Sequence, residues 1–124
     1  MNTLAERQRR HQLGHRAEVG AALWLRLLGW RIVARHFRGG GGEIDIAARR
    51  GNILAIVEVK ARQTEEDAAH ALGPQQRQRI VRATRALIAR PPTLSHCEVR
   101  FDVILIRPWA WPRRISAAFD ESGH

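Results

Sequence analysis

The sequence is short of the residues that build disulfides, sulfur-ligated metal sites and membrane spans. Cys97 is the only cysteine, so the chain can form no internal disulfide and no cysteine-based zinc site of its own. No apolar run approaches the roughly 20 residues of a membrane span. Positions 1–14 are polar and basic, unlike a secretory signal. We therefore expect a cytoplasmic protein with no membrane partner.

Lysine is equally scarce, because Lys60 is the only one and arginine carries nearly all the positive charge. The formal net charge is +9. Such a balance favours a polyanionic partner, nucleic acid before membrane, since arginine pairs bidentately with phosphate. The alternative is an arginine-rich composition inherited from a GC-rich genome.

The length of 124 residues suits one compact domain. We expect residues 15–124 to form it, with residues 1–14 as a basic N-terminal extension of the first helix. Hydrophobic periodicity predicts helices over 3–28 and from Pro74 to the Pro91-Pro92 stop. It predicts strands over 30–37, 43–49, 53–61, 98–106 and 115–119. The order αβββαβ, with a last edge strand, predicts an α/β fold with a mixed sheet flanked by helices.

Charges interrupt the apolar strand pair on either side of Gly51-Asn52, which is an acceptable hairpin turn. A two-residue turn there, or a four-residue loop, places Asp45 directly opposite Glu58. A three- or five-residue loop would shift the register by one. In the favoured register, Lys60 is a diagonal neighbour of Asp45 on the same face. The hairpin therefore predicts that the three side chains converge.

Two opposed carboxylates repel each other, and a shared proton, a nearby cationic side chain or a divalent cation would relieve this. Mg²⁺ is commonly held by one or two carboxylates, waters and substrate phosphate oxygens. We expect Asp45 and Glu58, with the Val59 backbone carbonyl, to bind Mg²⁺ or Mn²⁺. Lys60 could then orient the attacking water or stabilise charge on the phosphate. Glu18, which borders the buried stripe of the first helix, could complete the site.

Simpler interpretations stay open at this point. Glu58 and Lys60 could form an ion pair on a solvated strand end, and Glu43 could form a cross-strand salt bridge with Lys60. Asp45 could accept hydrogen bonds in the glycine-rich loop. Glu18 could be an exposed helix residue.

The constellation of Asp45, Glu58-Val59-Lys60 and Glu18 resembles the PD-(D/E)XK nuclease superfamily, whose restriction-endonuclease-like core has the same αβββαβ order. Gly14…Gly20, "GEIDIAARRGNILAIVEVKAR" and "RFDVILI" look more narrowly like the YraN-like family of small bacterial proteins. That family is similar in fold to archaeal Holliday-junction resolvases.

The resemblance implies that Asp45 and Glu58 bind metal, that Lys60 is catalytic and that Glu18 is an auxiliary carboxylate. Arg62 matches the arginine after the motif, and Asp102 matches an Arg-Phe-Asp pattern to which we assign no chemistry. Such proteins usually carry a lysine near Gln76. Here Gln76 or Arg77 could contact phosphate instead.

Three hypotheses follow. The first is a metal-dependent endonuclease acting on DNA, with branched or single-stranded DNA as candidate substrates. Cutting two strands would need two sites, so this hypothesis implies a homodimer. The second is a non-catalytic nucleic-acid-binding module that retains the fold. The third is an assembly adaptor that uses its basic segment, residues 7–16.

Other features carry less weight. The glycines at 39–42 lack the Gly-Lys-Ser/Thr of a P-loop and should let the chain turn tightly. The six histidines show no metal-ligand spacing and are expected on the surface. Trp24 is expected in the core, and Trp109 and Trp111 should pack at the domain edge rather than stack on bases. The arginines of the second helix could track a phosphate backbone or face solvent.

Overall fold

The structure, a computed structural model, describes residues 3–61, 72–107 and 110–121. Within these ranges it describes the side chains of all residues except 6–13. Arg62, most of the loop expected before Pro74, and Trp109 lie outside these ranges. The elements are α1 (Leu4–Leu27), β1 (Arg31–Gly39), β2 (Gly42–Arg50), β3 (Ile53–Ala61), α3 (Pro74–Ile88), the 3₁₀ turn η1 (Pro92–Leu94), β4 (Glu98–Ile106) and β5 (Arg113–Phe119).

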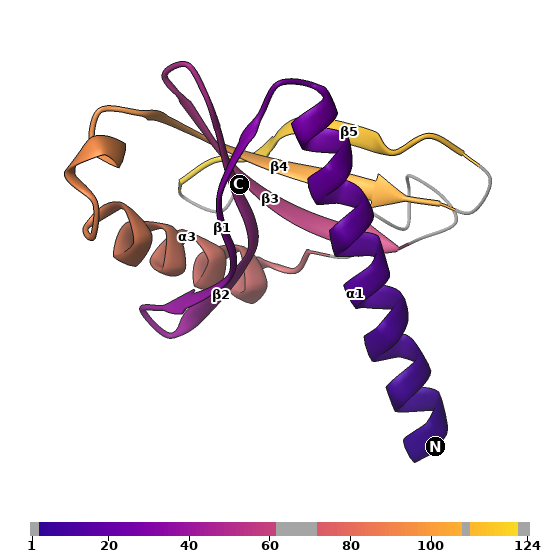
Figure 1. Cartoon of the computed structure of the whole chain (residues 1–124). Coiled ribbons are helices and arrows are strands. Elements are labelled where there is room, and N and C mark those ends of the chain that lie inside the picture. The colour runs from indigo at the N-terminus through magenta and orange to yellow at the C-terminus, as the bar shows by residue number, and fades with distance from the viewer. Residues whose placement is uncertain (1–2, 62–71, 108–109, 122–124) are drawn as a thin grey trace.

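The five strands form one sheet in the order β1-β2-β3-β4-β5. The first three strands are antiparallel neighbours, β3 and β4 are parallel, and β5 returns antiparallel to β4. The parallel step needs a crossover, which α3 provides. The predicted α/β fold with a mixed sheet is confirmed, and it is consistent with a restriction-endonuclease-like core (Figure 1).

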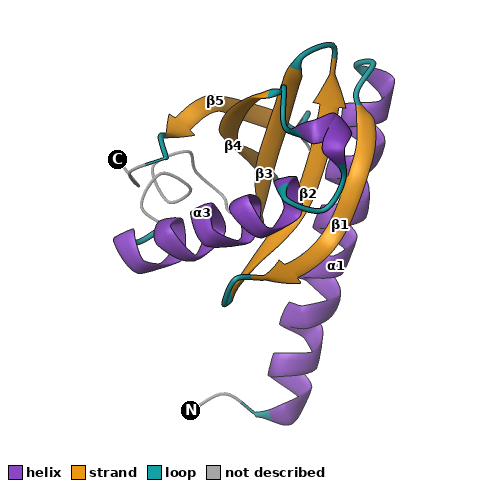
Figure 2. Ribbon diagram, turned by 90° about the vertical axis from the view of Figure 1, so that its left-hand side faces the viewer, coloured by secondary structure: helices purple, strands orange, loops and turns teal. Residues whose placement is uncertain are grey.

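The two helices cover opposite faces of the sheet (Figure 2). On one face Ala21, Ala22 and Leu25 of α1 pack on strand residues that include Ile46, Val57 and Ile104. On the other face Ile80, Val81 and Leu87 of α3 pack on a separate cluster of strand residues. The N-terminal half of α1 projects beyond the sheet (Figure 1). No helix in the described ranges combines the length and apolarity needed to cross a membrane.

Helical periodicity also predicts a buried stripe on the first helix, made of Ala17, Ala21, Trp24, Leu25 and Leu28, and two of these five residues are not buried. Leu28 lies just after the end of α1 and is 42% exposed. Trp24 is only half-buried, and its ring lies 5.6 Å from that of Trp111, which is itself 78% exposed. Among the described tryptophans the buried one is Trp30, directly before β1, with the guanidinium of Arg50 4.5 Å from its ring centroid. The tryptophan that packs into the core is therefore the one in the connection between α1 and β1.

The four-glycine segment forms a turn shorter than expected. Gly39 pairs with Gly42 in the β1–β2 ladder, so only Gly40 and Gly41 turn, with φ of 60° and 80°. A Cβ on Gly42 would overlap the Arg79 carbonyl oxygen, and one on Gly40 would lie 2.7 Å from the Arg82 carbonyl oxygen. The glycines therefore let the β1–β2 hairpin lie directly against the backbone of α3.

Replacing Gly42 with alanine should separate this hairpin from α3. Gly42→Ala is expected to lower the free energy of unfolding by about 1–3 kcal/mol, because backbone rather than a flexible side chain must move. Gly20→Ala is a matched control, since Gly20 lies within α1 with no atom within 4 Å of the added Cβ. That change should raise stability by about 0.5–1 kcal/mol. Urea unfolding measures both, and equal effects would contradict the close packing.

Candidate active site at the open end of the β2–β3 hairpin

The predicted hairpin register is present as far as the ladder extends. Arg50 pairs with Ile53 across Gly51-Asn52, and the pairing continues to Ile46 and Val57. Asp45 and Glu58 are the next residues in this register, but the ladder ends before them. The two carboxylates therefore lie at the point where β2 and β3 separate.

The Asp45 carboxylate accepts a hydrogen bond that a continued backbone ladder would have used. Hydrogen-bonded pairs recur at every second position from the turn, so Val59 N–H would next meet the Ile44 carbonyl. Instead it donates to the Asp45 carboxylate at 2.9 Å, and Asp45 N–H lies 3.5 Å from Glu58 Oε1. Since the N–H and C=O of one strand residue face the same neighbouring strand, the Val59 carbonyl faces this opening as well.

The alternation of side chains breaks at the same place. Residues two apart on a regular strand share a face, yet Ile44 packs in the α3 cluster and Ile46 in the α1 cluster. Arg35 of β1 pairs with Ile46, and Phe37 pairs with Ile44, so His36 and Asp45 lie between these two pairs. His36 has a φ of 50°, unusual for a residue with a side chain. Both β1 and β2 are therefore irregular at the position where the site lies.

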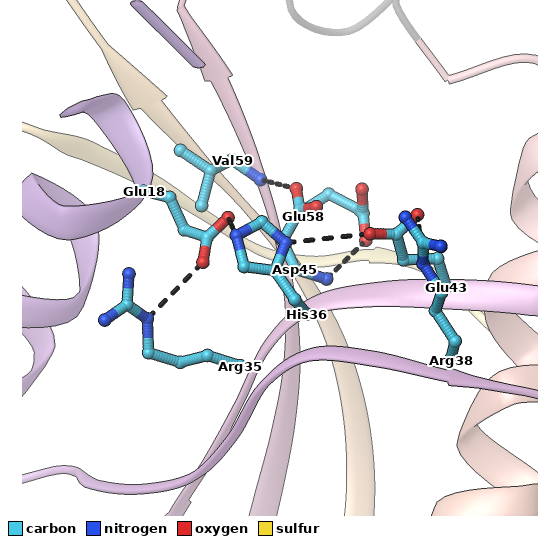
Figure 3. A network of polar contacts seen from close by, with 8 residues as sticks. All are labelled: Glu18, Arg35, His36, Arg38, Glu43, Asp45, Glu58 and Val59. Atoms are coloured by element: carbon cyan, nitrogen blue, oxygen red, sulfur yellow. Dashed lines mark hydrogen bonds and ion pairs between the residues drawn. The ribbon is translucent and has the colours of Figure 1, made fainter. Parts of the chain in front are cut away.

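Glu18 reaches this level from α1, and its 3% exposure rules out the alternative of an exposed helix residue. Its carboxylate lies 2.8 Å from His36 Nε2 and 3.4 Å from Arg35 Nε. The other imidazole nitrogen of His36 is 3.6 Å from Glu43 Oε1. Figure 3 shows His36 between the two glutamates, beside Asp45 and Glu58. The imidazole thus links the helix to the sheet at the site.

Burial and mutual repulsion disfavour charge on two of these carboxyls. Burial raises the pKa of Glu58 well above its usual range, and repulsion from Asp45, with which Glu58 can share a proton, raises it further. Attraction to Lys60 opposes this rise without cancelling it. Burial also raises the pKa of Glu18, against the influence of His36 and Arg35.

A cavity of about 520 Å³ opens over these groups. We call it the carboxylate cavity, and it is lined by Gly14, His15, Glu18, His36, Arg38, Glu43, Asp45, Glu58, Val59, Lys60 and Gln76. All four predicted catalytic side chains therefore reach one space. Gln76, at the start of α3, also reaches it, whereas the guanidinium of Arg77 bonds the Leu72 carbonyl and lies over the Phe119 ring.

The donors at this site suit a hard cation better than a zinc-like one. Within the described ranges, no three His, Cys, Asp or Glu side chains converge closely enough to hold a metal ion by themselves. Asp45, Glu58 and the Val59 carbonyl supply oxygen only, as Mg²⁺ or Mn²⁺ prefers when water and phosphate complete its shell. The mutual repulsion of the carboxylates fits the same ion, because a cation between them would relieve it.

Sequence analysis missed His36 as a site residue, although its assignment to the surface is correct, since the side chain is 51% exposed. A signal for it existed. If Gly40-Gly41 is taken as a two-residue turn, counting back from it places His36 opposite Asp45. Glu43, offered as a salt-bridge partner of Lys60, lies instead against His36 and Arg38, the latter at 3.7 Å.

Asp102 is the most deeply buried acid in the described ranges, with no measurable exposure, and it lies outside the carboxylate cavity. Its two oxygens accept hydrogen bonds from the Arg100 guanidinium at 2.9 Å each. One of them also accepts from Ala117 N–H at 3.0 Å, at the point where the β4–β5 register shifts. Asp102 therefore secures β5 to the sheet.

Comparison with known proteins gives a consistent family match. The profile of the Uncharacterised protein family UPF0102 matches residues 17–106, which include every described residue of the predicted catalytic set. A UPF0102 protein of Paramagnetospirillum magneticum is 49% identical over 119 residues, covering 90% of this chain and 92% of the relative. One from Rhodopseudomonas palustris is 50% identical over 117 residues, covering 94% and 87%. These matches confirm the YraN-like resemblance at the level of the family.

The raised pKa of Glu58 predicts an unusual dependence of stability on pH. The folded state binds a proton that the unfolded state has released, so without divalent cations stability should fall as pH rises above about 4.5. Glu58→Gln should flatten this fall and raise the unfolding free energy at neutral pH by about 1 kcal/mol or more. Urea unfolding in EDTA across pH 4.5–8 measures it. Glu98→Gln, at an exposed position, is the control, and an unchanged profile in Glu58→Gln would contradict the prediction.

The contact between His36 and Glu18 predicts an energetic coupling. His36→Asn tolerates the positive φ but withdraws the donor from a buried carboxylate, which should cost about 1–2 kcal/mol of unfolding free energy. His96→Asn, at an exposed position, should change stability by less than about 0.5 kcal/mol. A double-mutant cycle with Glu18→Gln checks the origin of the effect. Strictly additive effects of the two substitutions would show that the residues do not interact.

Proposed function

The chain belongs to the uncharacterised protein family UPF0102, and we propose that it hydrolyses phosphodiester bonds of DNA with a bound Mg²⁺ or Mn²⁺ ion. The observation that carries the proposal is the meeting of Asp45 and Glu58 with Lys60 in the carboxylate cavity. Their arrangement on a β-hairpin beside a helix-borne Glu18 supports the resemblance to PD-(D/E)XK nucleases. The net charge of +9 supports a polyanionic substrate.

Asp45, Glu58 and the Val59 carbonyl would hold the ion. When bound, such an ion polarises a phosphoryl oxygen and lowers the pKa of water that it coordinates. The hydrogen bond from Val59 N–H fixes the Asp45 carboxylate, so that residue needs little reorganisation to bind.

Lys60 supplies the only side-chain ammonium, and it lines the carboxylate cavity two residues after Glu58. There it attracts the phosphate and stabilises the negative charge that builds up on its oxygens as the bond to water forms. Glu18 lies on the α1 side of the same space, held by His36 and Arg35. Burial raises the pKa of Glu18, which would favour its carboxylate as the acceptor of a hydrogen bond from the attacking water.

Cleavage of labelled DNA tests the proposal. Duplex, single-stranded, flap and four-way substrates are incubated with Mg²⁺ or Mn²⁺, and products are resolved on denaturing gels. Asp45→Asn and Lys60→Ala should each lower the cleavage rate by about 100-fold or more, because each removes a group that acts on the reacting phosphate.

Glu98→Gln, prepared in the same way, should cleave like the natural protein, since Glu98 is exposed and is not among the residues that line the carboxylate cavity. Activity that survives in both Asp45→Asn and Lys60→Ala would reject the mechanism and indicate a contaminating nuclease. Tight binding without cleavage of any substrate would favour a non-catalytic nucleic-acid-binding module.

A further inference from the structure

A second cavity lies next to the carboxylate cavity on the side of α3. This second cavity, of about 270 Å³, is lined by Glu43, Asp45, Glu58, Gln76, Arg79 and Ile80. Four of these residues also line the carboxylate cavity, which in addition includes Arg38. The acidic centre therefore has an arginine on each side: Arg38 from the β1–β2 hairpin and Arg79 from α3.

A second exposed arginine follows Arg79 along α3. Arg79 and Arg82 are both exposed and lie three residues apart, so they are neighbours on the helix surface. No described carboxylate lies within ion-pair distance of either one, in contrast to Arg35, Arg38 and Arg100, each of which is paired with an acid, although Arg38 stays 81% exposed. Both cations are thus available to an external anion.

The glycine turn shapes the surface between these arginines. Gly40 lies against the Arg82 carbonyl oxygen, so the turn lies directly beside α3 at this point (Figure 2). Gly41 is exposed, and nothing lies within 4 Å of where its Cβ would be. The tip therefore offers backbone alone, with the 81% exposed side chain of Arg38 beside it. A bulky polyanion can approach such a surface closely.

Other arginines of this region have partners nearby. Arg82 and Arg85 both line a further cavity with Glu121, and the guanidinium of Arg90 lies 4.9 Å from the centroid of the Phe37 ring. Of the arginines on α3, Arg79 lines the second cavity itself and Arg82 lies against the Gly40-Gly41 turn. These two and Arg38 are therefore the arginines that lie next to the acidic centre and the turn.

We propose that Arg38, Arg79, Arg82 and the Gly40-Gly41 turn form a phosphate track that carries a nucleic-acid backbone across the carboxylate cavity on the α3 side. Arginine suits this task because its planar guanidinium pairs bidentately with phosphate. Such contacts position the backbone without reading bases. The choice of nucleic acid as the polyanion rests on the proposed function, whereas the location of the track rests on the arrangement of these side chains.

Binding measured without cleavage tests the track. Fluorescence anisotropy in EDTA follows labelled duplex DNA, single-stranded DNA and RNA of one length between about 50 and 200 mM salt. Arg79→Ala/Arg82→Ala is compared with Arg26→Ala/Arg31→Ala, which removes the same charge from exposed positions at the end of α1 and the start of β1. Alanine at 79 and 82 favours helix, and thermal unfolding checks that both variants are folded.

For the ligand that binds most tightly, the Arg79/Arg82 variant should lose at least about tenfold in affinity. Its plot of log affinity against log salt should be shallower by about two, since two phosphate contacts are gone. The Arg26/Arg31 variant should stay within about twofold of the natural protein. Equal losses in both variants would show a general charge effect and overturn the track, as would the absence of binding at low salt.

The outcome separates the track from the proposed hydrolysis. Binding that depends on Arg79 and Arg82, together with no cleavage of any substrate in Mg²⁺ or Mn²⁺, would keep the track and reject hydrolysis. Cleavage at an unchanged rate and KM in the Arg79/Arg82 variant would keep hydrolysis and reject the track.

Discussion

Repulsion between Asp45 and Glu58 is the constraint around which this end of the molecule is built. The β2–β3 ladder ends just before the two residues meet, and Asp45 accepts the Val59 N–H that the ladder leaves unpaired. A regular hairpin would have continued the backbone pairing and held the carboxylates at cross-strand distance, at a cost in stability. The opening instead releases both carboxylates from the backbone ladder, and the carboxylate cavity lies over them.

The two helices contribute differently to that opening. α1 brings Glu18 to it from one face, and His36 and Arg35 hold that carboxylate in place. α3 lies on the other face, close enough to the β1–β2 hairpin that only glycine fits at position 42. One helix therefore adds an acid, and the other places exposed arginines beside the acids. In the proposed function, chemistry and substrate binding would thus be served by elements on opposite faces of one sheet.

Local rules predicted the centre of the site, because hairpin register and helical periodicity depend on neighbours in sequence. They brought Asp45 and Glu58 together and located both helices and all five strands. They could not predict the burial of Glu18, which depends on how α1 packs against β1. They missed His36 because a strand residue with positive φ follows no hydrophobic pattern. Trp30 was missed as the buried indole because its burial comes from tertiary packing that includes Arg50.

Asp102 and Glu58 are both buried acids, but the fold balances their charges differently. Asp102 is the deeper of the two, yet a bidentate guanidinium and a backbone N–H balance its charge within the fold. Glu58 has a second carboxylate beside it and only partial compensation from Lys60. Substituting Asp102 would therefore disturb the seam between β4 and β5, with any loss of activity arising from the fold. In this architecture, the acid whose charge the protein leaves unbalanced is the better candidate for the proposed chemistry.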